Sequence, residues 1–180
     1  FGTLEYDTRE HPRLPMHGFL AALHASYYPI MLDNRRHFAD GRLDLRAYLD
    51  LRDGLTLALR TRVQKIWGRY PFYQAATLGG STVLRGYNRE RFAGDASALG
   101  TCELRLRVGS VRLLFPGTWG VLAFADAGRV YYAGERSRTL HTSFGGGIWG
   151  GFADRRLTFS AQAALSSERL ALSLNTGFTF

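Results

Sequence analysis

The sequence is poor in cysteine, in lysine and in long apolar runs, and each shortage excludes a class of protein. Cys102 is the only cysteine among 180 residues, which excludes an intramolecular disulfide and a cysteine metal cluster. No segment approaches the roughly 18 consecutive apolar residues of a membrane helix, so an α-helical membrane protein is excluded. The five histidines lack metal-binding spacing, and no G-x-S-x-G turn occurs. We therefore predict no catalytic residue, no metal and no cofactor.

The positive charge comes almost entirely from arginine. The chain carries 23 basic and 15 acidic residues, a formal net charge of +8, and Lys65 is the only lysine. The arginines alternate with acidic residues, as in Asp44, Arg46, Asp50 and Arg52, and do not gather in one arm or helix. This spread is not typical of nucleic-acid binding, and we predict no nucleic-acid partner.

Alternation of apolar and polar residues is the main pattern in the sequence. Hydrophobic residues make up 46% of the chain and aromatic residues 13%, with 21 glycines, which favours a sheet protein. The alternation has a period of two in residues 42–52, 55–64, 102–108, 157–165 and 170–180. Further strands are expected at 18–31, 119–132 and 140–152, with a shorter one at 1–6. Tight turns at 52–54, 153–156 and 166–168 predict an all-β, antiparallel fold of about eight long strands plus an N-terminal strand stub.

The expected strands run about 9 to 13 residues, close to the length that crosses a bilayer at a tilt. In a transmembrane β-barrel their charged side chains must line the interior, because a basic side chain facing lipid costs up to about 2 to 4 kcal/mol. A soluble barrel with an apolar interior and external arginines would show the same period. Periodicity alone leaves both architectures open.

A segment of about 30 residues, 68–97, interrupts the strands. It is rich in glycine, and its centre reads Val83-Leu84-Arg85-Gly86-Tyr87. A connection of this length inside a compact domain is usually functional. A second glycine-rich stretch, 145–150, satisfies G-x-G-x-x-G, but it lies inside an expected strand with no helix after it, so it predicts no dinucleotide site.

Four motifs follow one another along the chain. They are Tyr6-Asp7-Thr8-Arg9 with Pro12, Pro15 and Gly18; Leu84-Arg85-Gly86-Tyr87 after Leu78-Gly79-Gly80-Ser81; Phe124-Ala125-Asp126-Ala127-Gly128; and a final strand ending in Phe180. In this order and spacing, the sequence resembles the BamA/TamA superfamily of outer-membrane assembly and translocation barrels. The resemblance covers nearly the whole chain.

The resemblance implies that the long loop folds into the barrel and is locked to the wall. Arg85 would be the loop arginine, and Asp126 and Glu103 would be its partners on the wall. A bidentate guanidinium–carboxylate bond suits this task, because a long loop has a large closure entropy. Phe124, Asp126 and Gly128 share one face, so an inward Asp126 would leave space for the loop beside the glycine. With Gly86 and Tyr87 these residues form the expected loop-to-wall lock; the alternative is a solvated Arg85 and a surface Asp126.

The chain ends on two aromatic residues one position apart, Phe178 and Phe180. This spacing resembles the assembly signal of the same superfamily. The alternative is plain interfacial anchoring of a strand end, which every membrane barrel needs.

By resemblance, residues 1–180 form one barrel domain in the bacterial outer membrane that is not an enzyme and aids the insertion or export of proteins or lipids. Open sheet edges cannot sit in lipid. The strands must therefore close on themselves or join an N-terminal barrel half or a second copy, and we expect the C-terminal part of a larger barrel, without its periplasmic domains. The expected partners are outer-membrane lipid and client outer-membrane or secreted proteins. Two alternatives remain: a small passive barrel acting as structural protein, adhesin or narrow channel, and a soluble ligand-binding barrel.

Overall fold

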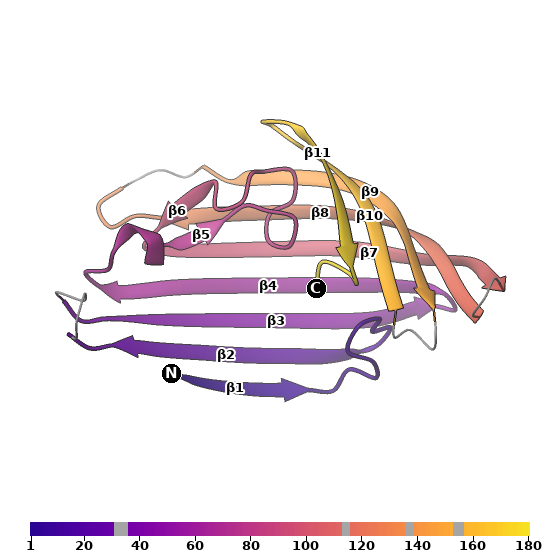
Figure 1. Cartoon of the computed structure of the whole chain (residues 1–180), viewed down its shortest axis with the longest axis horizontal. Helices are drawn as coiled ribbons and strands as arrows, with labels where there is room; N and C mark the ends of the chain where they lie inside the picture. The colour runs from indigo at the N-terminus through magenta and orange to yellow at the C-terminus, as the bar shows by residue number, and fades with distance from the viewer. Residues whose placement is uncertain (31–35, 113–115, 136–138, 153–156) are drawn as a thin grey trace.

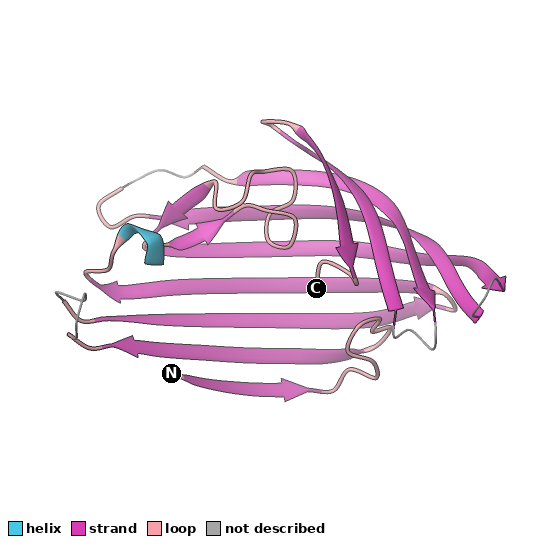
Figure 2. Ribbon diagram, viewed as in Figure 1, coloured by secondary structure: helices cyan, strands magenta, loops and turns pink. Residues whose placement is uncertain are grey.

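The chain folds almost entirely into β-strands in the computed structural model (Figures 1 and 2). The structure describes residues 1–30, 36–112, 116–135, 139–152 and 157–180. The strands are β1 (Gly2–Asp7), β2 (Gly18–Tyr28), β3 (Phe38–Arg52), β4 (Leu55–Gly68), β5 (Ala76–Leu78), β6 (Phe92–Gly94), β7 (Ala96–Arg112), β8 (Pro116–Tyr131), β9 (His141–Phe152), β10 (Leu157–Ser166) and β11 (Leu170–Thr176), with one short 3-10 helix, η1 (Phe72–Gln74). Within the described ranges, no helix is long and apolar enough to cross a membrane.

Nine strands form one antiparallel sheet in the order β1-β2-β3-β4-β7-β8-β9-β10-β11. Each strand pairs with its neighbour along the chain, except that the segment between β4 and β7 leaves the sheet and contributes the small β5–β6 pair. In the described residues β1 and β11 each pair on one side only, so the sheet is open and has the form of a partial barrel. Figure 1 shows β9, β10 and β11 bending over the inner side of the sheet.

The two faces of the sheet differ in polarity, as expected of a membrane barrel whose strands alternate polar and apolar side chains. Buried polar and charged side chains line the inner face, among them Asp44, Arg60, Gln64, Thr101, Glu103, Arg105, Asp126 and Gln162. Large apolar side chains are exposed on the outer face, among them Leu43, Leu49, Val63, Leu104, Phe144, Ile148, Leu172 and Leu174. The expectation of inward arginines is confirmed, and the alternative with an apolar interior is wrong.

The nine strands of the large sheet match the nine expected, β5 and β6 were not expected, and β3, β4, β7, β8 and β10 are longer than expected. The strand expected at 102–108 runs from Ala96 to Arg112, because its register with β8 continues through Ala96 and Tyr131. The loop expected at 68–97 is correspondingly shorter and contains η1, β5 and β6. The turn expected at 153–156 lies outside the described residues.

The C-terminal end differs from the sequence prediction. A final strand was expected through Phe180, but β11 ends at Thr176. Gly177 has a positive φ of 98°, a conformation that glycine adopts without strain, and the chain turns there. Phe180 then lies at the inner face, where it packs against Tyr48 and Ala58. Alternation could not reveal this turn, because the polar–apolar period continues through it.

Candidate functional site

The loop between β4 and β7 lies against the inner face of the sheet (Figure 1). Its base is fixed by backbone hydrogen bonds, since Ile66 N donates to Asp95 O at 2.9 Å and Asp95 N donates to Tyr131 O at 2.8 Å. Its apolar side chains Leu78, Leu84 and Tyr87 pack with Leu99 of β7. The loop therefore covers the wall formed by β7 and β8.

Arg85 is at the centre of this contact and is only 1% exposed. Its Nε donates to Asp126 Oδ2 at 2.8 Å and its Nη2 donates to Asp126 Oδ1 at 2.7 Å, which makes a bidentate ion pair with β8. Its Nη1 donates to Glu103 Oε2 of β7 at 2.6 Å. The structure thus brings together the three charged residues that the sequence singled out.

Arg105 completes the charge balance of the cluster. Its Nε donates to Glu103 Oε1 at 2.8 Å, so Glu103 lies between two guanidinium groups. Two carboxylates and two guanidiniums therefore form a neutral group in which all four side chains are nearly inaccessible to solvent. Buried charges are tolerated only when they are paired in this way. The pattern Glu103-Leu104-Arg105 could have revealed this residue, because positions two apart share a strand face.

The remaining predicted lock residues surround the ion pairs. The Phe124 ring lies beneath the Arg85 guanidinium at 3.4 Å, a cation–π contact. Gly86 has a φ of 85° and accepts a hydrogen bond from Ser166 Oγ through its carbonyl, at 2.8 Å. Tyr87 Oη donates to the carbonyl of Thr142 at 3.1 Å.

Gly128 provides the space for the loop that its position predicted. A Cβ built there would lie 3.0 Å from Leu78 Cδ1 of β5 and 3.3 Å from the carbonyl oxygen of Ala98. Any side chain at this position would press against β5. All seven predicted lock residues therefore lie in or beside one cluster, and their role in function stays a prediction.

Two further residues reach Arg85 and were not predicted. Gln162 Oε1 of β10 accepts a hydrogen bond from Arg85 Nη1 at 3.1 Å, and Thr179 Oγ1 lies 3.3 Å from the same nitrogen. Gln162 falls on the polar face of its strand, which was the available signal. Thr179 carried no signal, because its contact depends on the turn at Gly177.

The two C-terminal aromatic residues lie on the inner side and contact the same cluster. Phe178 stacks on the Arg105 guanidinium at 3.7 Å, and Arg105 Nη2 donates to the carbonyl oxygen of Phe180 at 3.2 Å. The described position of Phe180 is therefore not that of a strand end at an outer aromatic girdle. Whether the pair acts as an assembly signal stays a prediction.

A polar contact also holds the base of the loop, where the loop joins β7. Tyr70 Oη donates to Asp95 Oδ1 at 2.5 Å, and the backbone N–H of Ala133 donates to Asp95 Oδ2 at 2.5 Å. These two hydrogen bonds lower the pKa of Asp95, because they favour its ionised form. Burial and the hydrogen bond to Asp95 raise the pKa of Tyr70. The base of the loop is therefore tied by an ionised carboxylate at neutral pH.

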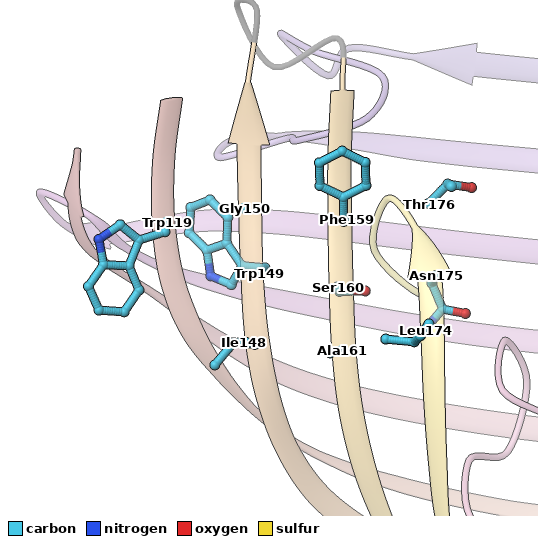
Figure 3. Close-up of a pocket in the computed structure, with 10 residues that line it drawn as sticks. All are labelled: Trp119, Ile148, Trp149, Gly150, Phe159, Ser160, Ala161, Leu174, Asn175 and Thr176. Carbon is cyan, nitrogen blue, oxygen red and sulfur yellow. The ribbon is translucent and has the colours of Figure 1, made fainter. Parts of the chain in front are cut away.

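An apolar groove of about 540 Å³ lies on the opposite, outer side of the sheet (Figure 3). Trp119, Ile148, Phe159 and Leu174, from four neighbouring strands, line it, and Gly150 and Ala161 form part of its floor. It contains none of the charged residues of the loop cluster. Among the described residues, no group of three or more His, Cys, Asp or Glu side chains could hold a metal ion.

The comparison with protein families agrees with this geometry. The family model of the Omp85 superfamily domain matches residues 1–168, which is most of the chain. No curated protein matches the sequence. The superfamily is one of outer-membrane assembly and translocation proteins in general, and the match is consistent with the BamA/TamA type that the motifs indicated. The chain belongs to the Omp85 superfamily.

Proposed function

We propose that this chain is part of an outer-membrane barrel that aids the insertion or export of proteins or lipids across the bacterial outer membrane, without catalysing a covalent reaction. The observation that carries the proposal is the buried ion-pair cluster of Arg85, Asp126, Glu103 and Arg105, which holds a long loop against the inner wall. The ion pairs tie this loop to two strands of the wall, β7 and β8.

The surface of the sheet supports placement in a membrane. Leu172 and Leu174 on β11 are 80% and 86% exposed, and apolar side chains cover the outer face along most strands. Such an apolar surface is favourable in contact with lipid and unfavourable in water. The strands β2 to β4 and β7 to β10 have 10 to 17 residues each, which is enough to cross the apolar core at a tilt.

The cluster links elements that are far apart in the sequence. Arg85 bonds to β7, β8, β10 and the C-terminal tail, so one loop residue joins three wall strands and the tail. A rearrangement of any of these parts would change the hydrogen bonds of Arg85. We propose that client outer-membrane or secreted proteins contact the barrel while the loop is held in this way.

The open edges imply further partners. The backbone groups of β1 and β11 that pair on one side only would each cost several kcal/mol in lipid. We propose that an N-terminal barrel half or a second copy of the chain pairs with these edges, and that periplasmic domains present clients to the assembly.

The proposal can be tested with the full chain in liposomes. A small, urea-unfolded outer-membrane barrel protein is added, and its folding is followed by its shift on unheated gels. We expect the client to fold faster than in empty liposomes, and Arg85→Ala to lose at least about tenfold of the acceleration. Arg89→Ala is the matched control, because Arg89 lies in the same loop, is 88% exposed and, among the described residues, pairs only with its neighbour Glu90.

The result that contradicts the proposal is equally concrete. If the folded chain gives no acceleration, or if Arg85→Ala and Arg89→Ala accelerate the client equally, the loop cluster has no part in assembly. A passive structural protein, adhesin or narrow channel would then be the better description. Heat-modifiability of each variant on gels shows that it is folded before the comparison is made.

A further inference from the structure

The inner wall at β3 and β4 carries more guanidinium groups than the carboxylates beside them can neutralise. Asp44 is the acidic residue at the centre of this patch, and both of its oxygens are occupied by Arg46 and Arg60. Two more arginines, Arg42 and Arg62, adjoin it without a carboxylate within 4 Å among the described residues. We propose that Arg42 and Arg62 form a binding site for a phosphate group, distinct from the Arg85 cluster.

The register of the sheet places the two arginines close together. Arg62 lies directly opposite Asp44 across the β3–β4 ladder, and Arg42 lies two residues before Asp44 on the same face. The two arginines are therefore diagonal neighbours, at a spacing that long side chains can bridge. Both are half-buried, and the Nε of Arg42 is buried without a hydrogen-bond partner.

Among the described residues, the nearby acidic groups form no ion pair with either arginine. Asp40, on the same strand face as Arg42, accepts a hydrogen bond from Gln64 at 2.7 Å. Glu5 lies on β1 in the same row as Asp44, but two strands away, which is about 10 Å.

In the described part of the sheet, the positions paired with the two arginines on β2 and β7 carry no negative charge. His24 of β2 lies opposite Arg42, with its ring nitrogens next to the hydroxyls of Thr3 and Ser26, and Leu99 of β7 lies opposite Arg62. Two like charges are therefore held together in a partly desolvated wall, which is unfavourable unless an anion joins them.

The number and type of donors indicate which anion fits. Two guanidinium groups carry two positive charges, and a phosphate monoester or inorganic phosphate carries about two negative charges above its second pKa of about 6. Each guanidinium can donate two parallel hydrogen bonds, and a tetrahedral phosphate offers oxygens in more than one plane to two arginines from different strands. A single carboxylate has one plane and one charge, so it would satisfy only half of the site.

The test uses the full chain folded in a zwitterionic detergent at about pH 8, where phosphate is doubly charged. Its unfolding midpoint is measured with increasing sodium phosphate against sodium chloride of equal ionic strength. We expect a saturable rise in the midpoint with phosphate only. Arg42→Gln and Arg62→Gln should each weaken the apparent affinity about tenfold or more, and the double variant should lose the response.

Arg52→Gln is the matched control, because Arg52 is an exposed arginine on the same strand, beyond the register shift that follows Asp50, and it should leave the response unchanged. If the double variant does not fold, the comparison uses the two single variants alone. A response equal in chloride, absent in the wild type, or unchanged in the Arg42 and Arg62 variants would overturn the proposal.

Competition identifies the source of the phosphate. Short-chain phosphatidic acid that displaces phosphate at about tenfold lower concentration, while phosphatidylcholine does not, would assign the site to a lipid headgroup. Displacement by inorganic phosphate alone would assign it to a soluble phosphate compound. Tighter binding of an acidic peptide that depends on the same two arginines would overturn the assignment to phosphate.

Discussion

Replacement of Arg85 by alanine is the most direct perturbation of the loop cluster. It removes both hydrogen bonds to the Asp126 carboxylate, at 2.8 and 2.7 Å, and the 2.6 Å bond to Glu103. Glu103 keeps Arg105 at 2.8 Å, so its charge remains compensated. Of its partners in the described ranges, Asp126 keeps only the backbone N–H of residue 85, at 3.3 Å, and Ser143 Oγ, at 3.5 Å. The destabilisation therefore comes mainly from one buried, unpaired carboxylate.

The expected magnitude follows from that single charge. Breaking a buried ion pair by removing one partner costs about 3 to 5 kcal/mol, and water near the inner face should place the value at the lower end, about 3 kcal/mol. This corresponds to roughly a hundredfold larger population of chains with a released loop. Proteolysis reports this population when the loop opens and closes faster than it is cut.

Limited trypsin digestion gives the measurement. We expect cleavage after Arg89 in the loop to become roughly a hundredfold faster in Arg85→Ala, and the unfolding midpoint in detergent to fall. Adding Asp126→Asn to this variant should restore part of the stability, because it removes the unpaired charge. Unchanged cleavage and stability in Arg85→Ala, or a further loss in the double variant, would refute the assignment of the energy to Asp126.

Three further perturbations test other parts of the structure. The ionised state of Asp95 contributes stability that is present above its ordinary pKa of 3.8 and is lost as the pH falls through its lowered folded pKa. Protease cleavage at the base of the loop should therefore become faster as the pH falls through this range. Asp95→Asn and Tyr70→Phe should each weaken this pH dependence of the cleavage rate. Gly86→Ala should destabilise the folded chain by about 1 to 3 kcal/mol, because residue 86 has a φ of 85°. It should destabilise more than Gly134→Ala, at a similar φ of 84°, because only a Cβ at residue 86 meets a described neighbour, Ser166 Cβ at 3.0 Å. Equal unfolding midpoints for the two variants would contradict this contact. Phe178→Ala should cost about 2 kcal/mol or more by removing the ring that covers a buried guanidinium, and denaturant unfolding that matches the wild type would show that the tail is not held at the inner face.

The sequence predicted the strands and their faces well, because both depend on local alternation. Leu170, Leu172 and Leu174 point outward, as their spacing indicated, and Asp126 and Glu103 point inward. The structure also brings together the loop and wall residues that the motif at Arg85 indicated by resemblance. The strand faces follow from the period of a strand, which any segment of sequence carries by itself, whereas the loop and wall residues followed from the resemblance.

The tertiary structure decided the contacts across the sheet that neither alternation nor the motifs indicated. Only the folded chain shows that Gln162 and Thr179 reach Arg85, and that Arg105 neutralises Glu103 and supports Phe178. In the same way, Leu14 in the turn after β1 is buried against Leu122, Phe124, Trp149 and Ala164 of distant strands.

The physical reason is that alternation fixes which side of the sheet a residue faces, but not which residue it meets there. The meeting partners depend on the curvature of the sheet and on the turn at Gly177, which is permitted by a positive φ that no periodic pattern encodes. Alternation and the motifs therefore determined an inner wall of charges and the expected partners of Arg85, and the fold determined how the remaining charges are paired.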